Sequence, residues 1–264
     1  MTKFGLLGAP DDLGVKNVFG RCGAAYGPKF FRTYFNFEHC LDFGDITNTH
    51  DLEQHYLQVA HGIEKIHNQN LKSILIGGGH DYAYSHLLGL KKIVPKISCI
   101  NIDAHLDVRP YEPLMTSGSP FRRAIEEGLI EGPELVEFGI QKYANKHNLF
   151  QYANQKNIPI YFYESMRQED KILVFKKALA ALKYPVVLSV DLDAVRISDA
   201  PGVSAPSVEG FFSHEVIEMI EACRDKILSL GIFELNPLHD HQNQTSRLAA
   251  RLAYAFTHPI DDFI

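Results

Sequence analysis

Three short segments of this 264-residue chain carry acidic and imidazole side chains in a pattern that suits a centre with two metal ions. They are Gly77-Gly78-Gly79-His80-Asp81, Asp103-Ala104-His105-Leu106-Asp107 and Asp191-Leu192-Asp193. Each follows a run of apolar, β-prone residues, and ligands of parallel sheets bind just beyond the carboxyl ends of the strands. We therefore expect six metal ligands to meet at one edge of a sheet: His80, Asp103, His105, Asp107, Asp191 and Asp193.

The donor types and their spacing indicate the chemistry of the site. Asp103, His105 and Asp107 alternate, so their side chains share one face if the segment is extended, and Asp191 and Asp193 repeat this spacing. A set dominated by carboxylates suits Mn²⁺, Mg²⁺ or Fe²⁺ better than a thiolate-rich zinc site does. Four buried aspartates need compensating positive charge, which two divalent cations provide. Such a pair can activate water for hydrolysis.

Alternating strand and helix patterns surround these segments and predict a mostly parallel sheet covered by helices. The apolar runs predict strands at 4–7, 73–76, 98–102, 135–139, 158–162, 186–190 and 227–233. Helical spacing of apolar residues predicts helices at 52–67, 174–182, 213–222 and 246–255. Long loops rich in Pro, Gly and Ser are expected at 107–121 and 195–211, where they would build the substrate pocket.

Composition narrows the class of protein. A chain of this length can form one large α/β core, so we expect a single domain over 1–264. The formal net charge of −6 gives no reason to expect nucleic-acid binding. The short apolar start of the chain reads as a first strand rather than a signal peptide, and no run approaches a membrane span. Four cysteines far apart in the sequence favour reduced thiols in a cytoplasmic protein.

The three segments resemble, in the same order, motifs of the ureohydrolase superfamily of arginase, agmatinase and formimidoylglutamase. Residues 8–12, 20–24 and 233–237 resemble further segments of that superfamily, so the likeness runs nearly end to end. It implies a three-layer α/β/α sandwich around a mostly parallel sheet, and a centre of two Mn²⁺ or other divalent cations. By this likeness His80, Asp103, Asp107 and Asp191 would hold one ion. Asp103, His105, Asp191 and Asp193 would hold the other.

Within the superfamily several stretches look most like formimidoylglutamase, namely 79–84, 107–110, 117–122, 139–145 and 200–206. This likeness implies a small-molecule amidine substrate: hydrolysis of N-formimidoyl-L-glutamate to L-glutamate and formamide, in histidine degradation. It also suggests a homotrimer or homohexamer. Two alternatives stay open. One is an agmatinase or another guanidino-compound ureohydrolase that releases urea, and the other is a non-catalytic arginase-like binding protein.

The expected reaction assigns roles to residues around the metal ligands. Asp107 would accept a proton from the attacking water as a catalytic base. Glu234 would pair with the cationic amidinium of the substrate, because such a group needs an anionic partner once it is desolvated.

Glutamate carries two carboxylates, and arginine binds carboxylates with two parallel hydrogen bonds. Of the arginines near the expected pocket, Arg109, Arg122, Arg123 and Arg21, the sequence analysis favours Arg122 and Arg21. Ser117 and Asn145 are expected to add polar contacts. Ser117 stands where arginase-like members have a histidine that is thought to shuttle protons. Since a serine hydroxyl cannot hold a positive charge near pH 7, an arginase-type relay is not expected.

Overall fold

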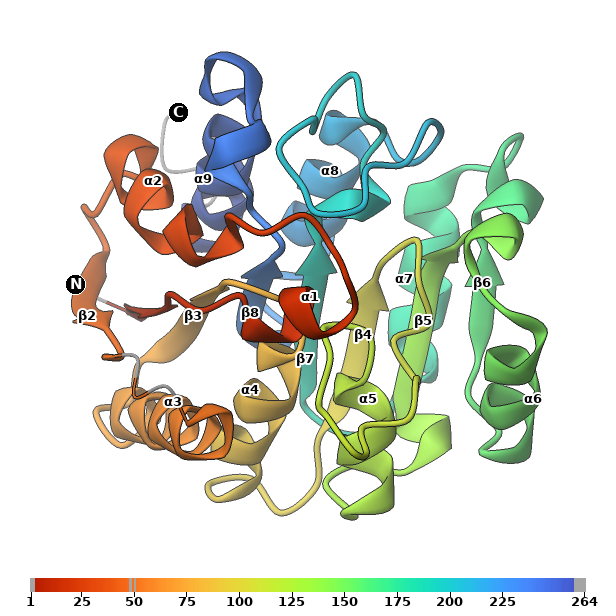
Figure 1. Ribbon diagram of the computed structural model, residues 1–264, viewed down its shortest axis with the longest axis horizontal. Helices are drawn as coiled ribbons and strands as arrows, with labels where there is room; N and C mark the ends of the chain where they lie inside the picture. Colours follow the sequence, from red (N-terminus) through yellow and green to blue (C-terminus); the bar gives the residue numbers. More distant parts are fainter. Residues whose placement is uncertain (1–2, 48, 50, 259–264) are drawn as a thin grey trace.

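A computed structural model describes residues 3–47, 49 and 51–258 of the chain (Figure 1). In this part of the chain eight strands form one sheet in the order β2-β1-β3-β8-β7-β4-β5-β6, and every neighbouring pair is parallel. The strands are β1 Phe4–Ala9, β2 Cys40–Asp45, β3 Lys72–Gly77, β4 Ser98–Ile102, β5 Leu135–Ile140, β6 Ile160–Phe162, β7 Val186–Asp191 and β8 Ile227–Phe233.

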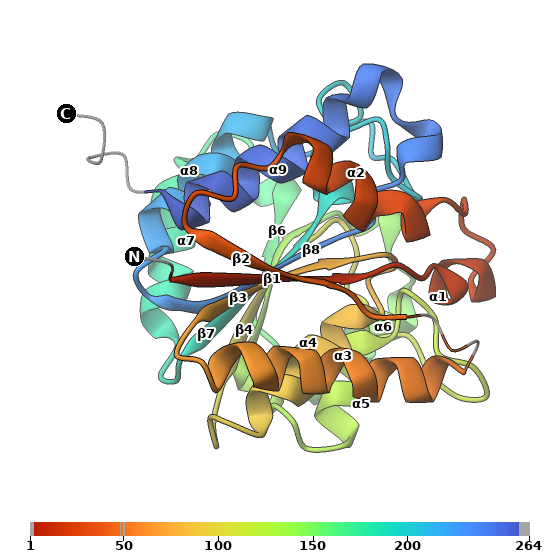
Figure 2. The same ribbon diagram turned by 90° about the vertical axis from the view of Figure 1, so that its left-hand side faces the viewer.

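Helices cover both faces of this sheet, which gives the three-layer arrangement expected from the sequence (Figure 2). One layer contains α2 Gly27–Tyr34, α9 Gln244–Thr257, α8 Ser213–Cys223 and α7 Lys171–Ala181. The other contains α3 Leu52–His67, α4 Tyr82–Lys91, α5 Pro120–Glu126 and α6 His147–Gln155. The short helix α1 Leu13–Asn17 follows β1 at the carboxyl edge of the sheet (Figure 1).

Each face of the sheet has its own hydrophobic core. In β4, Ile100 and Ile102 pack in the core shared with α7, α8 and α9, whereas Cys99 packs in the core shared with α3 and α4. In β7, Leu188 and Val187 divide between the two cores in the same way. Since both faces are buried, these strands read as continuous apolar runs rather than as alternating ones.

All seven strands expected from the sequence are present, and β2 is an eighth that the sequence analysis missed. β2 lies at the edge of the sheet and exposes Leu41 and Asp42, so its sequence lacks a continuous apolar run. Helix α4 was also missed. All but one of the first nine residues of α4 are buried, so it has no polar face from which a helical period can be read.

The order of the strands brings the candidate ligand segments together. Strands β3, β8, β7 and β4 are consecutive in the sheet, and the parallel direction places their carboxyl ends at one edge. The expected loops follow there. The first runs from Asp107 to Ser119, since α5 begins at Pro120, and the second contains only isolated bridges between Val195 and Phe211.

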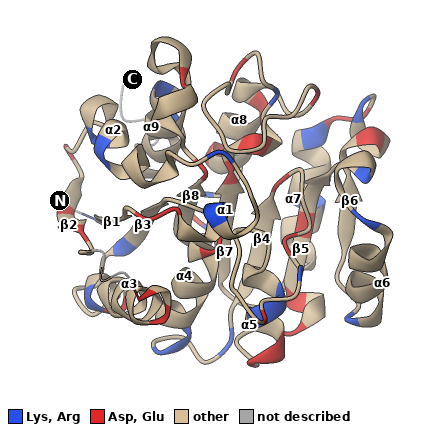
Figure 3. Cartoon of the chain, in the orientation of Figure 1, with Lys and Arg blue, Asp and Glu red and all other residues tan. Residues whose placement is uncertain are grey.

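Two further features concern partners. No helix in the described ranges combines the length and apolar character that crossing a bilayer requires. Figure 3 shows basic and acidic residues interspersed along the helices and loops of the described chain, without a continuous basic stripe in that view.

Candidate metal centre

The six expected ligands lie together at the carboxyl edge of the sheet. Their donor atoms form two groups, one of His80, Asp103, Asp107 and Asp191 and the other of Asp103, His105 and Asp193. Within each group the donor atoms are within 4.8 Å of one another, and Asp103 belongs to both. Two adjacent positions that share one carboxylate are what a centre with two cations requires.

The distances fit an octahedral divalent cation. His80 Nδ1 lies 3.1 Å from Asp103 Oδ2, 2.9 Å from Asp107 Oδ2 and 3.2 Å from Asp191 Oδ2. Adjacent ligands at ~2.1 Å from a shared octahedral ion are about 3.0 Å apart. In the second group His105 Nδ1 lies 3.0 Å from Asp193 Oδ2. Asp193 Oδ1 is buried and has no hydrogen-bond partner in the described part of the chain, as a carboxylate oxygen kept for a cation would be.

The end of β3 holds His80 in a fixed orientation. Gly78 lets the chain pass close to the N-terminal loop, since a Cβ there would lie 1.7 Å from the Asp11 carbonyl oxygen. The ring of His80 is fully buried, and its Nε2 lies 2.8 Å from Ser189 Oγ on β7. When Nε2–H donates to this hydroxyl, the lone pair of the neutral ring is on Nδ1, which faces the three carboxylates.

The segment after β4 differs from the expected extended row. Asp107 has a φ of 46°, in the left-handed region, and the residues from Asp103 onward form a bend rather than a strand. Asp103 Oδ1 accepts a hydrogen bond of 2.7 Å from the N–H of His105. Because the chain bends, Asp107 faces His80 while His105 faces Asp193. One short segment thereby supplies both groups.

Three polar residues outside the ligand set hold this segment. Asn145 accepts from Leu106 N and donates to Ala104 O, each at 2.9 Å. Asn101 donates to Asp103 Oδ2 at 3.1 Å and to Glu137 Oε2 at 3.0 Å. The sequence analysis missed Asn101 and Glu137, although a signal was present: both are polar residues inside apolar strand runs.

Burial and mutual repulsion perturb the acids of the centre. Burial, together with the Asp103 carboxylate, raises the pKa of Asp193 to about 7, against the opposing effect of His105. Burial and the neighbouring acids raise the pKa of Asp191 well above its ordinary value. Burial alone would lower the pKa of His80, but Asp103, Asp107 and Asp191 raise it well above the ordinary value. A site that favours extra positive charge this strongly suits divalent cations.

A cavity opens above the ligands, and besides the ligands its wall includes the basic side chain of Arg109 and the acidic side chain of Glu234. Glu234 follows β8 with a φ of 64°, and its Oε1 accepts a 2.9 Å hydrogen bond from His80 N. Burial and Asp191 raise the pKa of Glu234 to about 8. The other lining residues are Val15, Val18, Gly20, His80, His105, Asp107, Ser117, Gly118, Asp191, Asp193, Ser204 and Ala205.

Three residues expected to contact substrate do not line this cavity. Arg122 forms an ion pair of 2.9 Å with Glu126, and its guanidinium lies 4.4 Å from the centre of the Tyr152 ring. Arg21 donates to Val203 O at 2.5 Å and so supports the loop that contains Ser204. Asn145 binds backbone groups, as described above. Of the expected substrate contacts, Ser117 lines the cavity, and Arg109 is the arginine that accompanies it.

The fold and the site together define an α/β protein with a two-cation carboxylate–imidazole centre at the edge of an all-parallel sheet. A model of the arginase family matches residues 2–258, and the chain therefore belongs to that family. It is a binuclear metallohydrolase of the arginase fold.

Known relatives fit this placement. The chain is 34% identical over 270 residues to a formimidoylglutamase of Staphylococcus haemolyticus, covering 97% of this chain and 86% of the relative. A crystal structure of Trypanosoma cruzi formiminoglutamase with Mn²⁺ superposes with a TM-score of 0.91 at 27% identity, covering 97% of this chain and 92% of that one. A Bacillus subtilis arginase superposes with a TM-score of 0.89 at 25% identity, covering 97% and 98%.

Proposed function

We propose that this protein hydrolyses N-formimidoyl-L-glutamate to L-glutamate and formamide, with Mn²⁺ as its metal. The observation that carries the proposal is the pair of an acidic and a basic side chain on the cavity wall, Glu234 beside the ligands and Arg109 on the loop after them. The substrate carries matching groups: a cationic amidinium on its α-nitrogen, an α-carboxylate on the adjacent carbon and a γ-carboxylate at the far end. The formimidoylglutamase relatives support this choice within the family.

The roles of the residues follow from their positions. His80, Asp103, His105, Asp107, Asp191 and Asp193 would hold two divalent cations, whose positive charge makes water a nucleophile near neutral pH. The cationic amidinium favours the ionised form of Glu234, whose carboxylate pairs with it and aims its carbon at the attacking water. The Asp107 carboxylate accepts the proton that the water releases. The water oxygen bonds to that carbon, the bond between the carbon and the glutamate nitrogen breaks, and a proton passes to this nitrogen, so the products are formamide and free L-glutamate.

Arg109 takes the place that the sequence analysis gave to Arg122 and Arg21. Its backbone N–H donates to Gly118 O at 2.8 Å, which fixes the base of the side chain between the two halves of the loop. A guanidinium there binds a substrate carboxylate with two hydrogen bonds. Ser117, on the same cavity wall, adds a neutral hydroxyl to this contact.

The two alternatives differ in what the wall must bind. Agmatine carries a cationic tail, which Arg109 would repel, so a urea-releasing agmatinase fits this wall less well. A non-catalytic binding protein would have no need for six converging ligands with strongly perturbed pKa values. The similarity to an arginase keeps other guanidino compounds among the substrates to be tested.

The direct test is a product assay on Mn²⁺-loaded protein. We expect formamide from N-formimidoyl-L-glutamate, and no urea from agmatine or arginine, with both products measured by nuclear magnetic resonance. Urea without formamide would overturn the substrate assignment, and neither product from a protein that holds two Mn²⁺ would favour a binding role.

A set of arginine variants tests the polarity of the wall. Arg109→Gln should lower kcat/KM about 10- to 100-fold, mainly through KM, because a charged hydrogen bond contributes about 1.5–3 kcal/mol. Arg122→Gln tests the sequence-based assignment, and a loss equal to that of Arg109→Gln would restore it. Arg167→Gln is the matched control, since Arg167 pairs with Glu209 on the surface.

Assembly and location belong to the same proposal. A homotrimer or homohexamer is proposed from the family resemblance, and sedimentation analysis measures it. A cytoplasmic location agrees with four free cysteines, of which Cys40, Cys99 and Cys223 are buried.

A further inference from the structure

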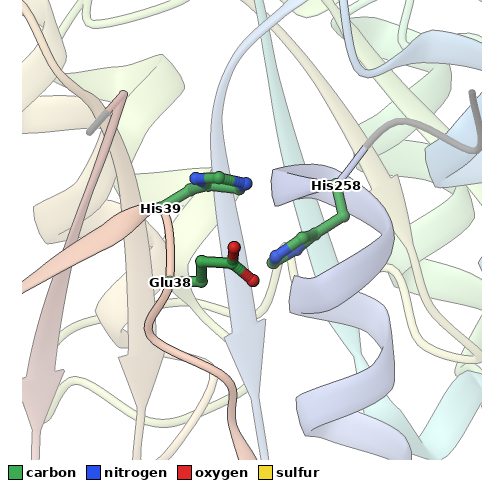
Figure 4. A group of neighbouring side chains, drawn as sticks. All are labelled: Glu38, His39 and His258. Atoms are coloured by element: carbon green, nitrogen blue, oxygen red, sulfur yellow. The ribbon is translucent and has the colours of Figure 1, made fainter. Parts of the chain in front are cut away.

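Glu38, His39 and His258 converge at the opposite end of the sheet from the catalytic cluster (Figure 4). Glu38 and His39 directly precede β2, and His258 directly follows α9, so the group joins two distant parts of the chain. We propose that these three side chains form a second cation site, selective for Zn²⁺ or a similar borderline transition metal rather than for Mn²⁺.

His258 is already held in the orientation that a metal ligand needs. It is buried, and its ring stacks on Tyr254 with ring centres 3.9 Å apart and an interplanar angle of 8°. Thr257 Oγ1 donates to the carbonyl oxygen of Ala253 at 3.1 Å, so it is free to accept from His258 Nδ1, 2.8 Å away. This contact favours the tautomer whose lone pair is on Nε2. Metal-bound histidines are commonly fixed in this way by a partner on the second nitrogen.

The other two side chains stand on a fixed backbone. The carbonyl oxygen of His39 accepts hydrogen bonds from Lys3 N at 3.2 Å and Phe4 N at 3.3 Å. Glu38 N donates to Asn36 Oδ1 at 3.0 Å, which shapes the turn before β2. On the other side Arg224 donates to the His258 carbonyl oxygen at 2.9 Å. Both halves of the site are therefore anchored before any ion binds.

The donor atoms of Glu38, His39 and His258 must move slightly closer together to bind an ion. One donor atom from each of the three residues lies within 4.8 Å of the other two, whereas ligands around a tetrahedral Zn²⁺ at ~2.0–2.1 Å are about 3.4 Å apart. The carboxylate of Glu38 is exposed and can move by this amount through a change of rotamer. The rings of His39 and His258 are tilted by 41° with centres 4.8 Å apart, so they do not form a parallel stack that closing on an ion would break.

The donor types separate this site from the catalytic one. Two imidazoles and one carboxylate suit Zn²⁺, Ni²⁺ or Cu²⁺, while the four aspartates of the catalytic cluster suit harder ions such as Mn²⁺. Three protein ligands leave one tetrahedral position for water.

The location gives the ion a structural role. Phe4, the first residue of β1, packs edge-on against Phe256 of α9 with ring centres 5.1 Å apart, and it pairs with Cys40 at the start of β2. An ion bound to His39 and His258 would therefore connect the edge strand with the last helix. Since the site lies at the amino ends of the strands, its occupancy can be read without measuring catalysis.

The test is a Zn²⁺ titration of full-length protein whose catalytic centre has first been loaded with Mn²⁺. Calorimetry gives stoichiometry and affinity, and elemental analysis after desalting gives the content of both metals. The variants are Glu38→Gln, His39→Asn and His258→Asn. His61→Asn is the matched control, because His61 lies on the surface of α3 with Glu64 as its partner.

We expect wild-type protein and His61→Asn to bind one further Zn²⁺ per chain without losing Mn²⁺. Each site variant should bind it at least about tenfold more weakly. Bound Co²⁺ should give the intense visible absorption of a four-coordinate ion in wild type but not in His39→Asn. Equal Zn²⁺ affinity in all four proteins and the wild type, or Zn²⁺ uptake matched by release of Mn²⁺, would overturn the proposal. Glu38→Gln alters an exposed side chain, so this variant keeps the test decisive even if His258→Asn does not fold.

Discussion

His80 and His86 lie six residues apart in the chain, and both are buried, yet their surroundings are opposite in kind. His80 faces three carboxylates, which raise its pKa well above the ordinary value despite its burial. For His86 no carboxylate of the described residues offsets burial, which lowers its pKa to about 3 with a smaller contribution from His67. The first histidine lies in a region with an excess of charge, and the second in a region without charge.

The neutral region is a short chain of hydrogen bonds between helices and strands. His86 Nε2 lies 2.5 Å from Ser229 Oγ, Ser229 contacts Ser73, and Ser73 Oγ lies 2.9 Å from His67 Nε2. Ser229 Oγ also donates to the carbonyl oxygen of Ser73 at 2.9 Å. These groups hydrogen-bond to one another and connect α3, α4, β3 and β8 without any ligand, although His86 Nδ1 is buried with no partner in the described part of the chain.

The catalytic cluster and the His86 network differ in a way that distinguishes functional from structural polar groups inside one protein. A buried network of neutral groups that hydrogen-bond to one another stabilises the fold. A buried cluster whose charges do not balance is stable only with a partner from outside the chain. Changes in the two regions should therefore have opposite consequences for stability and for activity.

The largest effect is expected at the catalytic cluster. Asp191→Asn should lower kcat at least about a thousandfold and reduce the Mn²⁺ content, because the variant loses a ligand and negative charge. After chelation of the metal, however, the variant should unfold at a higher temperature than wild type, since one of four crowded acids is gone. Elemental analysis and calorimetric melting measure both. A chelated variant that melts below chelated wild type would contradict the idea that the cluster is unbalanced.

An intermediate effect on stability is expected when the pH is lowered, because the buried His86 of the neutral network must then compete with protonation in the unfolded state. The folded pKa of His86, about 3, lies below the ordinary value of 6.5, so its contribution is complete above pH 6.5 and is lost as the pH falls toward 3. Between pH 7 and pH 5 this amounts to about 2 kcal/mol of unfolding free energy. Burial lowers the pKa of His67 to about 4 and acts in the same direction.

Urea denaturation of wild type and of His86→Gln at the two pH values isolates the contribution of His86. The variant should lose less stability on acidification than wild type does. An identical loss in both proteins would show that His86 is not held neutral in the fold.

The smallest effects are expected at Asn101 and Glu137, which lie beside the catalytic cluster on β4 and β5. Burial and nearby acids raise the pKa of Glu137 well above its ordinary value, which favours the uncharged carboxyl, so Glu137→Gln should change stability by less than about 1 kcal/mol. Asn101→Leu removes the donor to Asp103 and should weaken Mn²⁺ binding about tenfold. Metal titrations of both variants compare them. A larger loss of affinity in Glu137→Gln than in Asn101→Leu would mean that Glu137 is charged.

The sequence predicted those parts of the molecule that depend on local pattern. The strand before His80, Asp103 or Asp191 is a run of buried residues, and the ligands follow it directly, so type and spacing were sufficient. The helix at 52–67 has a clear apolar stripe, and its bounds were those of α3. The family resemblance supplied the three-layer arrangement that joins these elements.

The remaining features depend on how the chain is arranged in space. Whether Arg109 or Arg122 reaches the cavity follows from the bend at Asp107 and from the ion pair of Arg122 with Glu126, neither of which has a sequence period. Asn101 and Glu137 become partners only because β4 and β5 pair in that register. Helix α4, buried almost throughout, and the edge strand β2 lack the alternation on which prediction relies.

The candidate metal ligands and the other cavity residues lie on different kinds of segment, which affects how the substrate specificity of such a protein can evolve. The candidate metal ligands lie at or just after the ends of three central strands, β3, β4 and β7, whereas Arg109, Ser117 and Ser204 belong to the two irregular segments above them. The sequences of these two segments can therefore change without moving the candidate metal ligands. Replacing residues 108–119 with the corresponding loop of a guanidine-cleaving relative is thus a direct way to change the substrate specificity of this protein.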